Sequence, residues 1–299
     1  SLPNYKWKLE GESRLIGGYT CFKATTVQPV SQTDFRNFRP KKEEKKKEEA
    51  TDETKKPEGE AKKTNFMEDF ELPKNLDTLL LSSAHFGGND LDDYLNAINI
   101  NVIGALKLFD LAIKSDVKQF IYISSIYSHF EAKSPLSTIY SISKKSSEEI
   151  LLQYAKEKKI KLAIIRPSQI IGNFESNREH QPFFYSMLKK IKNSEDVIFY
   201  GKNDSKRNFI YIDDLSLVLN KVILAQLEGV FDCAFPLNTS FLEIANHAKA
   251  LYKSNSTIYF DETKSDILDN VFEYDFHLYD LINYYPKTRI TERIEKLIL

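Results

Sequence analysis

From about residue 75 to the end of the chain, apolar and polar positions follow two different periodicities. Short apolar runs rich in β-branched and aromatic residues suit buried strands, and longer segments with apolar residues every three or four positions suit helices. Strand and helix follow one another at the spacing of βαβ units. This predicts an α/β protein in which a parallel sheet is covered by helices on both faces. The predicted strands are 76–84, 120–125, 161–167, 197–200, 208–212 and 231–235, and the predicted helices are 99–114, 140–158, 183–193, 214–227, 240–252 and 288–299.

Two of these helices carry an apolar stripe that is predicted to face the sheet. The helix at 240–252 also has a capping-box start, because Glu243 follows Ser240 by three residues. The stripes consist of Val102, Ile103, Leu106, Phe109 and Ile113 on helix 99–114, and of Ile142, Ile150, Leu151 and Tyr154 on helix 140–158.

The first 74 residues have a different composition and a different pattern of apolar positions. Two short runs flank Gly17 and Gly18, and they predict two short strands. Residues 41–63 contain no large apolar residue and mix basic with acidic side chains. Such a segment cannot bury enough surface to offset the entropy of ordering it, so a disordered or loosely helical linker is expected. The predicted organisation is a small β-rich segment (1–40), a charged linker (41–74) and an α/β domain (75–299).

The composition is typical of a globular protein that works in a reducing compartment. Hydrophobic residues make up 41% of the 299 residues, charged residues make up 28%, and the net charge is −1. A near-neutral charge does not favour nucleic-acid binding, and no apolar run approaches the roughly 20 residues of a membrane span. The only cysteines, Cys21 and Cys233, lie far apart, and the five histidines lack metal-ligand spacing. We therefore expect a cytoplasmic protein without a disulfide framework or a metal site.

Candidate chemistry centres on one tyrosine. The spacing Tyr-x-x-x-Lys occurs four times, at Tyr19, Tyr140, Tyr154 and Tyr185, so the spacing alone does not define a site. Tyr140 differs in its context, because its helix follows a predicted strand that ends at Ser125. The carboxyl ends of parallel strands form the binding crevice of such folds.

The three side chains near this crevice suit proton transfer. A phenol with a pKa of about 10 is a poor base at neutral pH. Lys144 lies one helical turn after Tyr140, and its ammonium group would favour the phenolate and lower that pKa. The Ser125 hydroxyl could orient a substrate alcohol or carbonyl. Ser125, Tyr140 and Lys144 are therefore predicted to take a proton from a hydroxyl while hydride leaves its carbon.

Six stretches stand in the order found in one enzyme family. The chain from 75 to 299 resembles an extended short-chain dehydrogenase/reductase of the NAD-dependent epimerase/dehydratase group, which acts on nucleotide sugars. "YSISK" matches the Tyr-x-x-x-Lys signature of that family, and "VKQFIYISS" matches the strand before its active-site Ser. The other matching stretches are "LDTLLLSSAH", "NVIGALKLFDLAI", "IIRPSQIIG" and "RNFIYIDDLS".

The resemblance implies a fold and an activity. The fold would be Rossmann-like, with a doubly wound parallel sheet and a small C-terminal substrate-binding subdomain within 168–299. The activity would be that of an epimerase-type oxidoreductase and isomerase of carbohydrate metabolism, with NAD as cofactor and NADP not excluded. A keto-sugar reductase and a dehydratase are alternatives. The dehydratase is disfavoured because "IYSHF" stands where that type carries Asp-Glu after the active-site Ser.

The resemblance also implies roles for individual residues. Tyr140 would be the acid/base, Lys144 would bind the nicotinamide ribose, and Ser125 would hold the reacting oxygen. Arg207 would meet a nucleotide diphosphate, and Asn101 would support the site from the neighbouring helix. Alternatively, Ser125 ends a strand, Asn101 caps a turn, and Arg207 pairs with Asp204 or Asp213. A homodimer through the helices around Asn99 and Tyr140 would also fit the family. The implied cofactor-binding residues are Ser82, Ser83, Ala84, Asn101, Tyr140, Lys144, Pro167 and Ile170.

The chain departs from the family at its beginning. The family opens with a strand, a Gly-x-x-Gly-x-x-Gly loop and a helix, but only Gly11, Gly17 and Gly18 precede the charged segment. The N-terminal βαβ half of the fold is therefore expected to be missing or replaced. Residues 1–74, with "YKWKLEGESRLIGGYTCFKAT" and "FELPK", instead resemble a fragment of a GLPGLI-family protein. A truncated or chimeric, catalytically inactive fragment is thus the competing interpretation, with a junction near Lys74 and Asn75.

Overall fold

The computed structural model describes residues 7–16, 19–26, 72–73, 75–173, 180–272 and 275–297. The chain divides into two compact units, Ser1–Glu71 and Leu72–Leu299. In the first unit, β1 (Trp7–Ile16) pairs with β2 (Tyr19–Thr26) in an antiparallel hairpin, as the flanking runs predicted. The predicted linker 41–63 lies outside the described residues.

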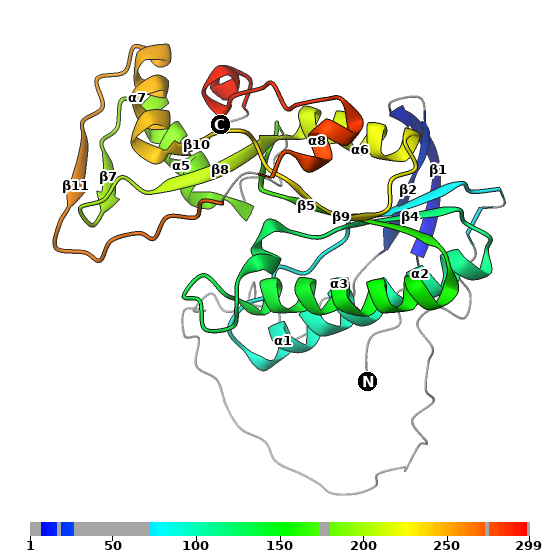
Figure 1. The fold of residues 1–299 in the computed structure, drawn as a ribbon. Coiled ribbons are helices and arrows are strands. Elements are labelled where there is room, and N and C mark those ends of the chain that lie inside the picture. The colour runs from blue at the N-terminus through cyan, green and yellow to red at the C-terminus, as the bar shows by residue number, and fades with distance from the viewer. Residues whose placement is uncertain are drawn as a thin grey trace, which may run out of the picture. The chain divides into compact units, whose positions relative to one another are not determined.

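The second unit is built on a four-stranded parallel sheet with the order β3-β4-β5-β9 (Figure 1). This confirms the predicted α/β, Rossmann-like class. The order makes β3 an edge strand, since within the described residues it pairs only with β4. The strands span Thr78–Leu81 (β3), Gln119–Ile123 (β4), Lys161–Pro167 (β5) and Gly229–Cys233 (β9).

Helices cover both faces of this sheet. Successive side chains of a strand point to opposite faces, so each strand contributes to two separate cores. Phe120 and Tyr122 of β4 pack in one core with α2 (Ala105–Lys114) and α3 (Ile139–Lys158). Ile121 and Ile123 pack in a second core with α6 (Ile212–Leu224) and α8 (His277–Ile282). The strand residues are therefore buried on both sides, and this explains their continuous apolar runs.

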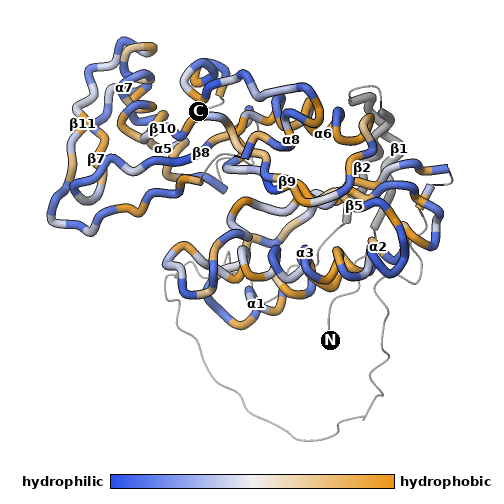
Figure 2. Tube along the Cα trace, viewed as in Figure 1, coloured by the Kyte–Doolittle hydropathy of each residue, from blue (hydrophilic) through white to orange (hydrophobic). Residues whose placement is uncertain are grey.

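The apolar stripe predicted for α3 faces the sheet only in part, through Leu151 and Tyr154. Leu151 is fully buried, but Ile142 and Ile150 are 41% and 39% exposed. Apolar and polar positions alternate along the helix (Figure 2), and its inward side is mostly polar. The buried residues of α3 are Ile139, Ser141, Ser143, Lys144, Ser147, Glu148, Leu151 and Ala155.

The stripe predicted for helix 99–114 is also wrong in part. The helical stretch begins earlier, with α1 (Leu91–Ala97), and passes through the π-helix η2 (Ile98–Gly104) into α2. Ile103 is 43% exposed, whereas Phe109 is buried as predicted, and the other buried positions are small or polar. A wider π-turn rotates the positions that follow it relative to an α-helix. The buried positions are Ala97, Asn101, Ala105, Phe109 and Ala112.

One helix among the described residues, Leu91–Lys114, is long and apolar enough to meet the length and composition criteria for a membrane span. Core helices of water-soluble proteins meet the same criteria, and Phe109 and Ala112 of this helix pack against the sheet. The match is therefore weak support for a membrane segment.

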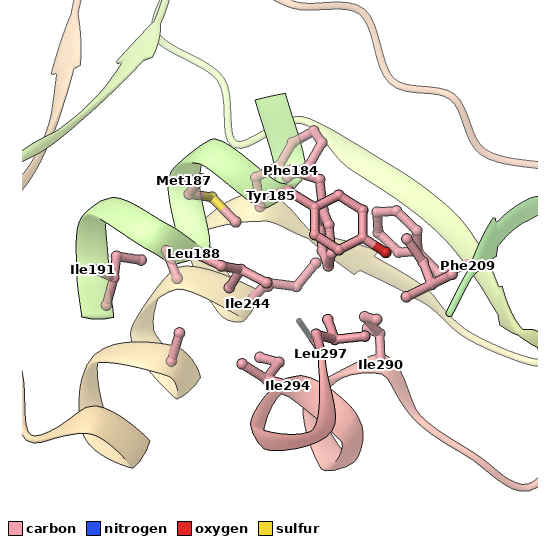
Figure 3. Close-up of a cluster of buried hydrophobic side chains, with 14 of the residues drawn as sticks. Phe184, Tyr185, Met187, Leu188, Ile191, Phe209, Ile244, Ile290, Ile294 and Leu297 are labelled. Carbon is pink, nitrogen blue, oxygen red and sulfur yellow. The ribbon is translucent and has the colours of Figure 1, made fainter. Parts of the chain in front are cut away.

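The remaining elements form a smaller layer at the carboxyl end of β5. A mixed sheet has the order β10-β8-β6, and β7 pairs with β11 in a parallel sheet. Helices α5 and α7 and the 3₁₀ helix η4 enclose an apolar core there (Figure 3). These elements span Gln169–Ile171 (β6), Pro182–Lys192 (α5), Val197–Tyr200 (β7), Lys206–Tyr211 (β8), Asn238–Ser240 (β10), Phe241–Tyr252 (α7), Ile258–Asp261 (β11) and Ile290–Lys296 (η4).

Two helices of this smaller layer were predicted from the sequence, α7 and the last helix of the chain. Ser240 caps α7, because its side chain accepts a hydrogen bond of 3.0 Å from the backbone N–H of Glu243. This confirms the predicted helix start. The short amphipathic helix predicted at the end of the chain is present as a 3₁₀ helix.

Candidate active site

The carboxyl end of β4 brings Ser125 to the edge of the sheet. The ladder continues one residue beyond the strand, since Ser124 N donates to the Ile165 carbonyl oxygen at 2.8 Å. Ser125 then caps the 3₁₀ helix η3 (Ile126–His129), and its Oγ accepts a hydrogen bond of 3.3 Å from Tyr127 N. Ser125 is buried. It therefore ends the strand and also presents its hydroxyl at the crevice.

Tyr140 lies in the first turn of α3. A capping box fixes this turn, because Thr138 N donates to Ser141 Oγ at 2.9 Å and Ser141 N donates to Thr138 Oγ1 at 3.4 Å. The loop after β3 lies against the same turn. Its Gly87 has a φ of +81°, and a Cβ there would lie 2.4 Å from Ile139 Cγ2. Only glycine meets both conditions, so this close approach depends on it.

Ser125 lies close enough to Tyr140 for its side chain to act on the phenol by hydrogen bonding. Burial raises the pKa of Tyr140 above its ordinary value, the hydrogen bond with Ser125 lowers it, and nearby Tyr127 raises it again. The net direction is upward, so the phenol is an acid at neutral pH. We expected Lys144 to lower this pKa, and the structure departs from that expectation because the ammonium group has other partners.

Lys144 is among the most buried side chains of the chain, at 1% exposed. Its Nζ donates to the Ile123 carbonyl oxygen at 2.8 Å and lies 4.6 Å from the centre of the Tyr122 ring. Burial lowers the pKa of Lys144 to about 8, and the negative charge of Glu148 opposes that effect. The cation is thus held at the end of β4 by a carbonyl dipole and an aromatic face.

Asn101 braces the loop after β3 against α3. Its Oδ1 accepts from His85 N at 2.8 Å, and its Nδ2 donates to the His85 carbonyl oxygen at 2.8 Å and to Ser143 Oγ at 2.9 Å. Ser143 Oγ in turn donates to the Tyr140 carbonyl oxygen at 3.0 Å. Asn101 lies in the π-helix, an element often found at functional sites. Its amide is therefore occupied by the protein, in line with the predicted supporting role.

The remaining predicted cofactor-lining residues lie just after β3, at the end of β5 and within β6. Ser82 and Ser83 come after β3 and are exposed, and Ala84 is partly buried. Pro167 ends β5 and is buried, while Ile170 lies in β6 and packs against the core of the α6 face. No hydrogen bond or ring contact joins them to Tyr140 or Lys144 among the described residues.

Arg207 lies on β8, in the smaller layer. Its Nη1 donates to Ser205 Oγ at 2.6 Å and to the carbonyl oxygens of Lys206 and Leu268 at 2.8 and 2.7 Å. In the part of the chain that the structure describes, no carboxylate forms an ion pair with it, so the alternatives Asp204 and Asp213 are not seen. Burial lowers the pKa of Arg207, although Tyr127 and Asp269 raise it.

Four side chains at the site were missed in the sequence. The Phe86 ring stacks on Tyr140 with centroids 5.1 Å apart, and Tyr127 contacts Asn270 by a hydrogen bond from Asn270 Nδ2. Asn270 Oδ1 is buried without a partner among the described residues. Glu148 lies one turn beyond Lys144 and is 2% exposed. Its spacing could have signalled a shared face, but Phe86, Tyr127 and Asn270 come together only in three dimensions.

Known proteins with related sequences act on nucleotide sugars, by their names. The chain is 28% identical over 167 residues to UDP-glucose 4-epimerase of Vibrio cholerae, which covers 50% of this chain and 49% of that protein. It is 30% identical over 126 residues to ADP-L-glycero-D-manno-heptose-6-epimerase of Brachyspira hyodysenteriae, covering 40% of each. The chain therefore spans about half or less of the length of the curated relatives it matches.

Solved structures share the fold at low identity. UDP-glucuronic acid 4-epimerase from Bacillus cereus, in complex with NAD, has a TM-score of 0.61 and 18% identity, covering 75% of this chain and 73% of that one. RMD from Pseudomonas aeruginosa, complexed with NADPH, has a TM-score of 0.61 and 17% identity, covering 74% and 78%. At such identities the likeness concerns the fold.

Two family models match the chain. Residues 7–68 match a family described as a protein of unknown function (Porph_ging), and the resemblance of this region to GLPGLI proteins stays a prediction. Residues 40–230 match the other model, which begins before β3 and ends in β9, and so includes the whole Ser125, Tyr140 and Lys144 arrangement. The chain belongs to the NAD dependent epimerase/dehydratase family.

Proposed function

We propose that this chain is a nucleotide-sugar epimerase-type enzyme that uses Ser125, Tyr140 and Lys144 with NAD or NADP. The observation that carries the proposal is that Ser125 lies close enough to Tyr140 to influence its pKa, while the buried Lys144 donates to the Ile123 carbonyl oxygen at the carboxyl end of β4. The names of the relatives, which include UDP-glucose 4-epimerases, support a nucleotide-sugar substrate.

In this proposal the residues move one proton. Tyr140 takes the proton of a sugar hydroxyl and returns it after the carbon has been re-reduced, while Ser125 holds the reacting oxygen. A bound nicotinamide would supply the hydride acceptor and donor. A phenol with a raised pKa must be paired with a nearby positive charge to act as a base at neutral pH. Lys144, one helical turn after Tyr140, is the residue proposed to supply that charge.

The residues fit one end of the cofactor better than the other. Asn101 is hydrogen-bonded to Ser143 of α3, the helix that carries Tyr140 and Lys144, and a nicotinamide ribose would need a phenol and an ammonium group. A dinucleotide also needs backbone N–H groups for its pyrophosphate, which the family draws from a glycine-rich loop. The described residues contain no such loop. The proposal that the chain binds the cofactor therefore rests on the residues that would hold the nicotinamide end of the dinucleotide.

Arg207 would hold the diphosphate of the substrate. A half-buried guanidinium without a carboxylate partner attracts an anion, and phosphate suits its planar donors. Tyr127 lies close enough to both Arg207 and Tyr140 to influence their pKa values. The acid/base and the anion site would then lie at two ends of one substrate.

An inert fragment is the alternative. The sequence lacks the glycine-rich loop before residue 75, and within the described residues β3 has no neighbour on its outer side. An unpaired edge invites association with other strands. A keto-sugar reductase or a dehydratase remains a further alternative for an active chain. The cytoplasmic location also remains a prediction.

The exposed apolar side chains of η2 and α3 favour a homodimer. Ile98 and Ile103 are 42% and 43% exposed, and Ile142 and Ile150 on α3 are similarly exposed. Large apolar patches rimmed by polar residues are typical of interfaces. A second copy of the chain would cover them by packing helix against helix.

The Tyr140→Phe variant should still bind the cofactor but should lose turnover. We expect millimolar NAD⁺ to raise the melting temperature of the wild-type chain and of Tyr140→Phe alike, because the ligand binds only the folded state. Conversion of UDP-glucose to its C4 epimer should fall by about 100-fold or more in Tyr140→Phe, since the general acid/base is gone. Absence of any shift with NAD⁺ and NADP⁺ would support the inert fragment.

Stability should rise with pH because of Lys144. Its folded pKa of about 8 lies below its unfolded value of 10.5, so between these values the unfolded chain binds a proton that the folded chain does not. The free energy of unfolding should increase by about 1–2 kcal/mol from about pH 7.5 to about 9.5. Urea titrations should show this rise in the wild type and in Lys145→Met, but not in Lys144→Met. Equal slopes in all three proteins would contradict a buried, destabilised ammonium group.

Arg207→Met should weaken UDP binding by about 10-fold or more, because a charge-assisted bond to phosphate is lost. Isothermal titration calorimetry measures this directly. Arg289→Met is the matched control, since Arg289 already pairs with Glu243 at 3.5 Å. Equal affinities in all three proteins would remove Arg207 from the substrate site.

The dimer should be visible in light scattering. We expect the wild-type chain at tens of micromolar to show twice the monomer mass of 34.6 kDa, and Ile150→Lys to show the monomer mass, because a charge cannot be buried there without a partner. Leu224→Lys on α6, at a position that is 69% exposed, is the control. A monomeric wild type would exclude this interface.

A further inference from the structure

Glu148 is a carboxylate buried inside the candidate site. It lies one helical turn after Lys144 on the inward face of α3 and is 2% exposed. A charged carboxylate is buried only where hydrogen bonds and an opposite charge compensate for the lost water. The side chain has both, and its partners come from the strands that carry the site.

Two of its partners flank Ser125. Ser124 Oγ donates to Glu148 Oε1, and Ser128 Oγ lies 2.8 Å from the same oxygen. Ser128 Oγ also lies 2.7 Å from the Ser125 carbonyl oxygen, so its single hydrogen is shared between that carbonyl and the Glu148 carboxylate. The residue before Ser125 and the residue three positions after it are therefore tied to one carboxylate on the helix that carries Tyr140.

The other partner fixes the carboxylate itself. Arg166 at the end of β5 donates from Nε to both Glu148 oxygens, at 3.0 and 3.1 Å, and from Nη2 to Oε2 at 2.5 Å. The guanidinium continues to Asp232 of β9, with Nη1 3.7 Å from Oδ1. Asp232 is also 2.8 Å from His129 Nε2. A bidentate pair of this kind holds both groups in one orientation.

We propose that Glu148 is a positioning residue that sets the Ser125 turn against Tyr140 and Lys144 on α3. The inference rests on the proposed function of that site. It follows from the connectivity: the carboxylate joins the turn after β4, helix α3 and the end of β5, and it lies close to Lys144 and to the two serines that flank Ser125. A hydroxyl contact in an active site tolerates only a fraction of an ångström of displacement.

The charge of Glu148 has a second effect on the same arrangement. It lies close enough to Lys144 to raise the pKa of that ammonium group against the effect of burial. Replacing the carboxylate by an amide would keep most of the shape but remove this attraction. A residue that only stabilised the fold would not change how Lys144 titrates.

The experiment compares three variants of the full chain without substrate or cofactor. Glu148→Gln removes the charge, and Ser128→Ala removes one tether while leaving the ion pair intact. Glu149→Gln, at the exposed neighbouring position of α3, is the control. NMR of isotope-labelled lysine and tyrosine follows the titration of Lys144 and the phenol-carbon shift of Tyr140, which reports its hydrogen bonding. Lys144→Met and Tyr140→Phe assign the two signals.

We expect Glu148→Gln to lower the pKa of Lys144 by about 0.5–1 unit and to move the Tyr140 signal. Ser128→Ala should move the Tyr140 signal and leave the Lys144 titration unchanged, and Glu149→Gln should change neither. If Glu148→Gln does not fold, Ser128→Ala decides the question. Unchanged Tyr140 signals and a Lys144 pKa within about 0.2 unit, with only a lower melting temperature, would overturn the proposal.

This outcome is independent of turnover. Because no cofactor or substrate is present, a failed activity assay would count against the proposed function and leave the NMR result standing. Conversely, an active enzyme whose Lys144 and Tyr140 signals ignore Glu148 would refute the positioning role alone.

Discussion

The burial of one ammonium group organises this structure. Lys144 has almost no contact with water, and its charge is balanced by the Ile123 carbonyl, the Tyr122 ring and the nearby Glu148. A cation in that position requires a polar inward face on α3, and Glu148 in turn requires Arg166 from β5. The lysine thereby links the end of the sheet to the helix that carries Tyr140. Burial of such groups costs stability and is typical of sites that do chemistry.

The sequence predicted the architecture well and the helix faces poorly. Strand runs such as 120–125 and 161–167 are apolar because both sides of a parallel sheet are covered, and the structure places β4 and β5 there. The stripe on α3 was wrong in part, since Ile142 and Ile150 are exposed while Lys144 and Glu148 are buried. Periodicity assumes that the inward face is apolar, and that assumption breaks down where a helix carries a functional site.

Some residues of the candidate site could be predicted from the sequence, and others could not. Ser125, Tyr140 and Lys144 follow from a strand end and one helical turn, so local reasoning reached them. Phe86 and Asn270 come from loops whose path only the fold determines, and nothing in their neighbourhoods in sequence marks them. The direction of the Tyr140 pKa was also out of reach, because it depends on burial and on where the lysine makes its hydrogen bond.

The chain matches the epimerase/dehydratase family, but the glycine-rich loop of that family is missing from its sequence. The decisive question is therefore whether a nicotinamide can react beside Tyr140. The near-ultraviolet absorbance of reduced nicotinamide, recorded after mixing the concentrated chain with NAD⁺ and UDP-glucose, answers it most directly. The account predicts that absorbance appears with the wild type, up to one equivalent per chain, and not with Tyr140→Phe. If folded wild-type protein gave no signal with NAD⁺ or NADP⁺ and a range of nucleotide sugars, the Ser125, Tyr140 and Lys144 arrangement would not be an active site in this chain.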